Sequence, residues 1–535
     1  MTETTTEPNL PAELPGTTGN GHRPAPVRVS ARDARYGDLV RGKNQRWVGR
    51  PDYVCLPVST SEVRTAVQDA VSARKRISVR SGGHCYEDFV YNPDVEVVID
   101  LSEMTRVSFD REMNAFSIEA GAELLDVYET IYRLRGVTFP GGMCYSVGAG
   151  GHICGGGYGF LSRKHGLVVD YLYAVEVVVV DQRGKAKAVI ATREADDPRR
   201  DLWWAHTGGG GGNFGVVTRY WLRAPEADTD RTAPLLPSPP AEVLASAVSW
   251  EWASMTEAAF RRLLGNFADW QVRNQDPESP AASLFATLSL NHRSNGQIGM
   301  MTQMDASVPN ADKVLAEFLD AVAAGVEPPA GPMTKAMGDH LPRPELATPR
   351  RLPWLQATQM LATGTPTLTN PSLRAKYRSA YLRSVLTDDQ IGTIYRCLTS
   401  TDYENASALL LISAYGAKIN AVPPRETAVA QRDAVMKLLI QNYWSDPADD
   451  AYHLRWIREF YRDVFAETGG VPPHDDRTAG CYVSYPDVDL DSPEWNSSGL
   501  SGVQLYYGVN YPRLRAVKRR WDPGNVFRHR QSIRP

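Results

Sequence analysis

The chain has 535 residues, more than one average domain, so we expect a large buried core divided between two domains. With 42% hydrophobic and 22% charged residues it is predicted to be soluble and globular. No stretch approaches the ~20 apolar residues that a membrane-spanning helix needs. The net charge of −4 gives no general reason to expect a nucleic-acid partner.

The N-terminal stretch is rich in Thr, Glu, Pro and Gly and lacks the apolar segment of a secretory signal. We therefore predict a mobile tail over residues 1–30 and a cytoplasmic protein. The six cysteines show no spacing typical of a small disulfide scaffold. A zinc site built from Cys144, His152 and Cys154 would need a fourth ligand that the local sequence does not supply, so no metal is predicted.

The first predicted elements alternate between helix and strand. Ser59 to Glu62 form a capping box at the start of a helix predicted over residues 57–75, and Ile77 to Val79 form a strand that runs into a glycine loop. A second strand is predicted over Val95 to Asp100. Helix, strand, glycine loop and strand in this order favour an α+β domain whose loops hold a ligand at the strand ends.

Further along, a helix is predicted over Leu124 to Leu134, ending near Gly136, and a buried strand over Val175 to Val180. The proline-rich stretch from Pro234 to Pro240 is typical of a linker. From about residue 242 to residue 480, strand-like runs alternate with amphipathic helices, which include residues 312–326 and 452–467. The basic cluster at residues 513–520 is predicted to be the solvated face of a terminal helix.

Two glycine-rich loops each carry a nucleophile. His84 ends the run that starts at Arg80, and Cys144 lies in the long loop from Gly141 to Gly159. Glycine permits positive φ and has no Cβ to block a ligand, so an imidazole and a thiolate could each bond a ring carbon of the same flavin. The alternative is a set of structural turns. A dinucleotide fingerprint is excluded because Ile153 stands where its third glycine is needed, and a phosphate-binding P-loop is excluded because no Gly-Lys-Ser/Thr follows.

Five motifs resemble, in order, the signatures of the berberine-bridge-like branch of the FAD-linked oxidases. They extend over residues ~50 to 535, and they are Arg80 to His84, Cys144 to Gly159, Gly212 to Val217, Tyr482 to Asp487 and Tyr507 to Leu514. The resemblance is strongest to bacterial members that oxidise sugars on antibiotics. It implies an α+β fold with a vanillyl-alcohol-oxidase-like (PCMH-type) FAD-binding domain and an antiparallel-sheet substrate domain.

The implied organisation is a split FAD domain. Residues 31–225 form its first part, residues 226–480 form the substrate domain, and residues 481–535 return to the FAD domain. The resemblance implies that His84 bonds the flavin 8α carbon and that Cys144 bonds C6. The other implied cofactor-binding residues are Arg80, Ser81, Gly82, Gly83, Cys85, Gly141, Val147, Gly148, Gly151, Gly159, Val217, Tyr507 and Asn510. Packing is the favoured role for Cys85 and Cys154, and His152 and His165 are expected to be structural or flavin-adjacent.

Alcohol oxidation needs a base for the hydroxyl proton while hydride leaves the carbon. The family resemblance makes Tyr485 the leading base, Tyr415 a second active-site tyrosine and Tyr86 a residue that orients the substrate. Because an unperturbed tyrosine has a pKa near ~10, a tyrosinate base needs a nearby donor or positive charge.

The predicted function is FAD-dependent oxidation of an alcohol on a sugar or a glycosylated natural product, with O₂ reduced to H₂O₂. The alternatives are oxidative cyclisation of an alkaloid-like or polyketide substrate, and a flavin-binding protein without turnover. The expected partners are a small glycosylated molecule and O₂, and the expected state is a monomer or a homodimer.

Overall fold

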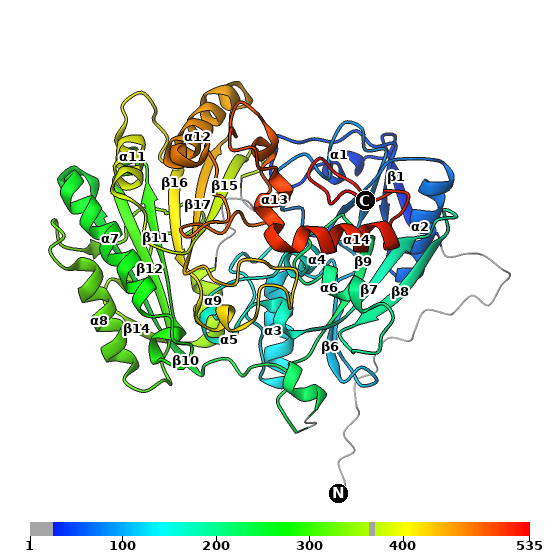
Figure 1. Cartoon of the computed structure of the whole chain (residues 1–535), viewed down its shortest axis with the longest axis horizontal. Coiled ribbons are helices and arrows are strands. Elements are labelled where there is room, and N and C mark those ends of the chain that lie inside the picture. Colours follow the sequence, from blue (N-terminus) through cyan, green and yellow to red (C-terminus); the bar gives the residue numbers. More distant parts are fainter. Residues whose placement is uncertain (1–24, 230–231, 363–369) are drawn as a thin grey trace, which may run out of the picture.

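The computed structural model describes residues 25–229, 232–362 and 370–535 (Figure 1). Most of the predicted N-terminal tail therefore lies outside the described residues. Its predicted end at residue 30 is too late, because Val27–Ser30 form strand β1 and pair with strand β2, Tyr53–Leu56. Within the described ranges, no helix is both long and apolar enough to cross a membrane.

The first sheet has four strands in the order β1-β2-β4-β3, with β4 at Val97–Asp100 and β3 at Ile77–Arg80. Strand β4 runs parallel to both β2 and β3, and helix α2, Thr60–Ser72, connects β2 to β3. The Ser59 side chain accepts a hydrogen bond from Glu62 N, which confirms the predicted helix start. The first glycine loop leaves this sheet at the end of β3. A short helix α1 spans Tyr36–Leu39.

The second sheet has five antiparallel strands in the order β5-β6-β9-β7-β8. They are β5 (Val107–Asp110), β6 (Ala115–Glu119), β7 (Leu172–Val180), β8 (Ala186–Thr192) and β9 (Val216–Leu222). Helix α3, Leu124–Arg135, ends at Gly136 with φ of 65°, as the sequence predicts. The shorter helices here are α4 (Ala149–Cys154), α5 (Ser162–His165) and α6 (Arg200–Ala205).

The third sheet has eight antiparallel strands, with the main order β13-β10-β12-β11-β16-β17-β15 and β14 paired to β10. The strands are β10 (Glu242–Glu251), β11 (Leu284–Asn291), β12 (Gln297–Asp305), β13 (Gly331–Pro332), β14 (Arg350–Pro353), β15 (Arg374–Leu382), β16 (Ala408–Ala414) and β17 (Met436–Trp444). The helices of this half are α7 (Glu257–Arg273), α8 (Ala311–Ala323), α9 (Trp354–Leu361), α11 (Asp388–Thr399) and α12 (Asp450–Val464).

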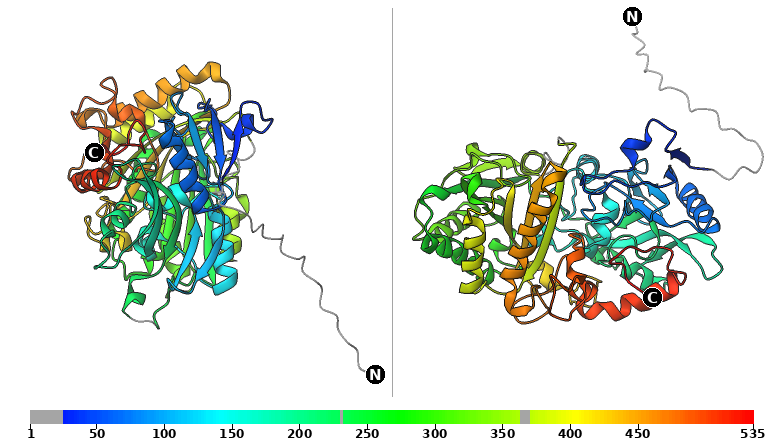
Figure 2. Two further views of the ribbon diagram at one scale, coloured as in Figure 1. Left: turned by 90° about the vertical axis from the view of Figure 1, so that its right-hand side faces the viewer. Right: turned by 90° about the horizontal axis from the view of Figure 1, so that it is seen from above.

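Helices α7, α8 and α11 cover the outer face of the third sheet, and its inner face turns toward the first two sheets (Figures 1 and 2). The helices predicted at residues 312–326 and 452–467 are confirmed as α8 and α12. The predicted linker from Pro234 to Pro240 is irregular and lies between β9 and β10, where the chain passes from the second sheet to the third. The domain boundaries at residues 225 and 480 stay a prediction.

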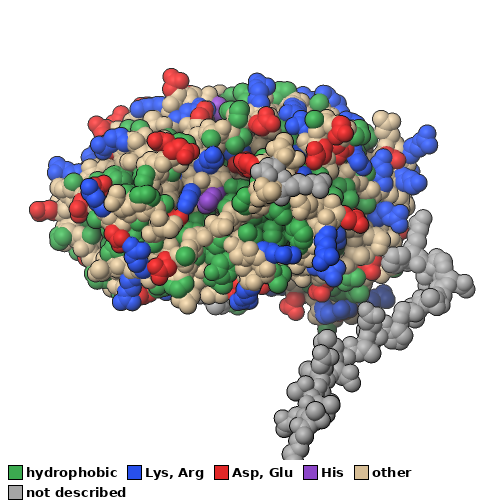
Figure 3. Space-filling model, turned by 90° about the horizontal axis from the view of Figure 1, so that it is seen from below, with side chains coloured by type: hydrophobic (Ala, Val, Ile, Leu, Met, Phe, Trp, Pro, Cys, Tyr) green, Lys and Arg blue, Asp and Glu red, His purple; other side chains and the backbone are tan. Residues whose placement is uncertain are grey.

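The C-terminal segment contributes α13, Gly502–Tyr507, and α14, Tyr511–Trp521 (Figure 1). Helix α14 lies against α6. Its basic cluster is not wholly solvated, because Lys518 is 0% exposed and donates to Asp522 Oδ2 at 2.6 Å and to Asn213 O at 2.5 Å. The prediction was wrong at Lys518, since a lysine with a carboxylate four residues on can be buried as a pair. On the face seen in Figure 3, basic and acidic side chains are interspersed.

Candidate active site

A cavity of about 390 Å³ lies between the glycine loops and the third sheet. Its lining includes the loops within residues 77–90, 142–154 and 206–217, strands β11 and β15 to β17, Asp339 and His340, and the C-terminal stretches at residues 482–486, 506–507 and 527–531. Both predicted nucleophiles and the predicted base Tyr485 are among the lining residues. The structure therefore brings His84, Cys144 and Tyr485 to one cavity although they are far apart in sequence.

The two glycine loops touch each other. A Cβ on Gly82 would lie 2.6 Å from Ser146 O, and a Cβ on Gly148 would overlap Ser81 Oγ, so neither position has room for a side chain. Gly151 also lines the cavity, and a Cβ there would meet nothing within 4 Å. The loops thus pack closely while Gly151 leaves open space beside its backbone, as a flat ring system would need.

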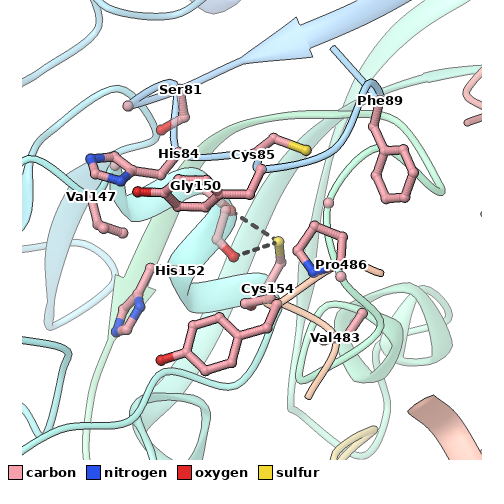
Figure 4. A pocket seen from close by; sticks show the side chains of 18 of the residues that line it. Ser81, His84, Cys85, Phe89, Val147, Gly150, His152, Cys154, Val483 and Pro486 are labelled. Carbon is pink, nitrogen blue, oxygen red and sulfur yellow. Dashed lines mark hydrogen bonds between the residues drawn. The ribbon is translucent and has the colours of Figure 1, made fainter. Parts of the chain in front are cut away.

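His84 is prepared to act as a nucleophile. Its Nε2 lies 2.8 Å from Ser146 Oγ, two residues beyond Cys144, and Figure 4 shows its ring next to Val147. Burial, together with the charges of Lys43 and Arg80, lowers the pKa of His84 to about 3. The imidazole is therefore neutral at physiological pH and keeps a nitrogen lone pair. Cys144 is half-buried and lines the same cavity.

Most of the predicted cofactor-binding residues also line the cavity. They are Arg80, Ser81, Gly82, Gly83, Cys85, Val147, Gly148, Gly151, Val217 and Tyr507. Arg80 forms an ion pair with the buried Asp100 at the end of β4. Tyr507 donates to Gly209 O at 2.9 Å, which ties α13 to the run from Gly208 to Gly212, here called the third glycine cluster.

The cysteines other than Cys144 on this wall make backbone contacts. Cys154 Sγ bonds Gly150 O at 3.0 Å and Gly151 O at 3.5 Å, as the dashed lines in Figure 4 show. Cys85 Sγ bonds Glu87 O at 3.4 Å. Burial raises the pKa of both thiols to about 12, so each is uncharged, as a packing role requires.

Four predicted site residues lie outside the cavity lining. Tyr415 is 0% exposed and packs among other rings, with Tyr381 at 5.1 Å between centroids. Asn510 Nδ2 donates instead to Pro424 O at 2.7 Å. Gly141 and Gly159 face each other, because a Cβ on Gly159 would overlap Gly141 O. These positions support loops and packing behind the cavity, and the structure gives them no place in its wall.

His152 lines the cavity as a loop support. Its Nε2 accepts a hydrogen bond from Gly142 N at 3.0 Å, and burial lowers its pKa to about 4. Figure 4 shows it on the same side of the pocket as His84. His165 is not part of the lining, and burial lowers its pKa to about 4 as well. Both histidines are therefore neutral at physiological pH.

Tyr485 belongs to a group of tyrosine rings that faces the glycine loops. Its ring centroid lies 5.0 Å from that of Tyr482 and 5.7 Å from that of Tyr377, and both pairs are edge-on. Tyr86 stacks on Tyr377 with 4.3 Å between centroids. Burial raises the pKa of Tyr485, so its phenol is neutral unless a positive charge favours the phenolate.

Lys437, which the sequence analysis missed, supplies such a charge when its amine is protonated. Its Nζ lies 3.9 Å from the ring centroid of Tyr158, 4.5 Å from that of Tyr482 and 4.9 Å from that of Tyr485. The residue is 3% exposed, and burial lowers its pKa to about 7. A lysine inside the apolar run from Met436 to Ile440 is a sequence signal that could have marked it.

Asp339 is a second residue that the sequence analysis missed. Its Oδ2 accepts a hydrogen bond from Tyr443 Oη at 2.9 Å, and burial raises its pKa to about 6. Its Oδ1 is shielded from water and has no hydrogen-bond partner among the described residues. Asp339 lines the cavity from a loop without a regular pattern, so no sequence signal points to it.

The described residues fit a flavin better than a metal. Within those residues, no group of three or more His, Cys, Asp or Glu side chains is arranged to hold a metal ion. The glycine cradle, the neutral imidazole of His84 and the half-buried thiol of Cys144 suit a flat organic ring. This combination defines a flavin-binding protein as the class to which the site belongs.

Comparison with known proteins agrees. A protein-family model of an FAD binding domain matches residues 51–187, and a second family model, described as berberine and berberine like, matches residues 481–534. The aclacinomycin-N/aclacinomycin-A oxidase of Streptomyces galilaeus is 47% identical, over 96% of this chain and 91% of the relative. The hexose oxidase of Chondrus crispus is 33% identical, over 94% of this chain and 93% of the relative.

Solved structures extend the likeness to the fold. A glycopeptide hexose oxidase complexed with teicoplanin is 47% identical, with a TM-score of 0.88 over 96% of this chain and 99% of that one. Aclacinomycin oxidoreductase is 45% identical, with a TM-score of 0.87 over 96% of this chain and 100% of that one. The chain belongs to the berberine-bridge-like family of FAD-linked oxidases. Its predicted fold class and its predicted enzyme class, an oxidase acting on CH–OH groups, are confirmed.

Proposed function

We propose that this oxidase holds FAD through bonds to both His84 and Cys144 and oxidises an alcohol on a sugar or a glycosylated natural product, in the tailoring of an antibiotic. One observation carries the proposal: the cavity lined by both nucleophiles is also lined by Tyr485 and Lys437. The relatives support the substrate class, because they include an aclacinomycin oxidase and a hexose oxidase.

When bound, FAD supplies the hydride acceptor. Tyr485 takes the proton of the substrate hydroxyl on its phenolic oxygen, so the alcohol loses one proton and one hydride and becomes a carbonyl. The ammonium of Lys437 favours the phenolate form of Tyr485 that can accept this proton. Tyr86 orients the substrate, and the apolar side chains of Leu411 and Leu439 exclude water. O₂ accepts the two electrons with two protons and leaves as H₂O₂.

The attachment is tested by acid precipitation. The precipitated protein should remain yellow, and the His84→Ala and Cys144→Ala variants should each remain yellow because one bond is left. Only the double variant should release FAD into the supernatant. Release of FAD from the unmodified protein would contradict the proposal of covalent attachment.

The substrate class is tested by anaerobic bleaching of the flavin and by peroxide release. Aclacinomycin A and teicoplanin are suitable glycosides, and their sugar-free aglycones are the matched controls. Bleaching by a glycoside but not by its aglycone supports sugar oxidation. Bleaching by an aglycone with formation of a new ring would instead indicate oxidative cyclisation. A flavin that no compound reduces would indicate a binding protein without turnover.

A further inference from the structure

A layer of buried charges lies directly behind the tyrosine rings of the cavity. Lys376 Nζ forms an ion pair with Glu87 and donates to Asp487 Oδ1 at 2.6 Å. Arg378 Nε donates to Asp487 Oδ2 at 2.7 Å. The side chains of these four residues, here called the charge layer, are each 2% exposed or less.

Each part of the charge layer is next in sequence, or nearly so, to one ring of the cavity. Glu87 follows Tyr86, Lys376 precedes Tyr377, and Asp487 comes two residues after Tyr485. We call Tyr86, Tyr377 and Tyr485 the aromatic wall. The wall is continuous, because Tyr86 stacks on Tyr377 at 4.3 Å and Tyr485 meets Tyr377 edge-on at 5.7 Å.

The geometry of strand β15 explains how both layers form. Successive residues of a strand point to opposite faces, so Lys376 and Arg378 face the charge layer while Tyr377 faces the cavity. The ion pairs join the loop after β3 and the C-terminal stretch to this one strand. Three distant segments, each with one ring of the wall, are thereby fixed to each other.

Lys376 is held as a cation. Burial alone would lower the pKa of Lys376, but Asp487 and Glu87 outweigh it and the pKa is raised. Asp489 adds a further contact to Lys376 Nζ at 3.2 Å and is itself paired with Arg458 at 2.9 Å. A buried cation shared among carboxylates on separate segments resists sliding of one segment past another, because any shift leaves a charge without its partner.

We propose that the charge layer is a positioning device for catalysis: it sets the relative places of the three rings of the aromatic wall and thereby aims Tyr485 at the substrate hydroxyl. This inference rests on the proposed function, in which Tyr485 is the base. Glu87, Lys376 and Asp487 are positioning residues, since their contacts run through the backbone beside the rings and not to the substrate.

The test uses Glu87→Gln and Asp487→Asn in the flavin-loaded enzyme. Both changes keep the size of the side chain, replace one acceptor oxygen by an amide nitrogen and remove one charge. Lys376→Met is avoided because it leaves the buried carboxylate of Glu87 without its ion-pair partner and is expected to unfold the protein. Flavin reduction per bound flavin should fall by up to about 10²-fold in each variant, with kcat affected more than KM, because misplacement of about 1 Å has that effect. Crystal structures should show Tyr86 or Tyr485 displaced from Tyr377.

The control is Asp228→Asn, which disturbs the ion pairs of Asp228 with Arg193 and Arg223, three residues outside the cavity lining. It should lower the Tm as the other variants do, while reduction per bound flavin stays unchanged. In a Tyr485→Phe background the loss caused by Glu87→Gln should disappear, because the base that it aims is gone. Unmoved rings, an unchanged rate, or the same loss in that background would overturn the proposal. If no glycoside reduces the unmodified enzyme, the proposed function fails, and the ring positions still decide the positioning claim.

Discussion

Tyr485 is the side chain on which the proposed chemistry depends most directly. Its Phe variant should keep both flavin bonds, because His84 and Cys144 lie on the other loops of the cavity. Loss of a general base costs about 10²–10⁴-fold in rate, so stopped-flow flavin reduction should slow on that order while substrate binding changes little. If reduction is as fast as in the unmodified enzyme, the base lies elsewhere, and Tyr415→Phe is the next variant to measure.

Replacement of Lys437 is expected to lower the rate of flavin reduction and to raise the stability of the fold. In Lys437→Met the charge beside Tyr485 is lost, and flavin reduction should slow about tenfold, the value of a buried cation next to an aromatic ring. The rate of the unmodified enzyme should fall as the pH rises through about 7, because Lys437 loses its proton there. The variant should lack this fall.

The stability of the same variant should rise. The folded-state pKa of Lys437 is lowered from 10.5 to about 7, so the lysine's contribution is fully present only above pH 10.5 and is lost as pH falls through 7. At pH 7 and below, Lys437→Met should therefore have a higher Tm than the wild type. A slower enzyme that is also less stable would contradict this account and would indicate a defect in folding.

Asp339 should make stability depend on pH in the acidic range. Its folded-state pKa is raised from 3.8 to about 6, so proton binding stabilises the fold below pH 3.8, and this contribution is lost as pH rises through 6. Asp339→Asn should consequently raise the Tm at pH 7 to 8, and the gain should shrink to nothing near pH 4. Thermal unfolding across this range is the measurement. Asp476→Asn, at an exposed position, is the control and should show no such trend.

At the scale of elements, α13 and α14 are expected to be indispensable for flavin incorporation. Tyr507 lines the cavity from α13, and Lys518 of α14 holds Asn213 O beside the third glycine cluster. Truncation after residue 500 should therefore give protein without covalent flavin, measured by absorbance after acid precipitation. Deletion of residues 1–20 is the control and should leave the flavin content unchanged. A truncated protein with full flavin content would show that the C-terminal helices are peripheral.

The elements that the sequence predicted well have strong local signals. The cap at Ser59, the helix end at Gly136 and the β-branched run of β7 each depend on residues close in sequence. The order of the third sheet has no such signal, because β16 pairs with both β11 and β17 across long intervening segments. Lys518 was misjudged in part for the same reason: Asp522, four residues on, is a local partner, but the carbonyl of Asn213 comes from another part of the chain.

For the molecule as a whole, the sequence pointed to the side of the cavity formed by the glycine loops and missed much of the side formed by the third sheet. The glycines of the two loops allow the loops to pack closely, and this can be predicted from the sequence. The family resemblance predicted the roles of His84 and Cys144. Lys437 and Asp339 acquire theirs only when the third sheet closes over those loops. Tyr415 differs, because its local sequence resembles an active-site motif while packing places its ring against Tyr381, outside the cavity lining.

The contact between the two glycine loops has a consequence for the order of events in the cell. His84 and Cys144 can bond one flavin ring only after their two loops have come together. The proposed attachment of FAD to both residues therefore follows folding of the part of the chain that carries these loops. Once made, the two bonds would act as a covalent staple across a loop of 60 residues. Such a crosslink lowers the conformational entropy of the unfolded chain, which stabilises the folded state by about 4 kcal/mol. The bound cofactor would then stabilise the fold that binds it. Protein that carries covalent flavin would unfold at a higher temperature and resist proteolysis for longer than protein without flavin.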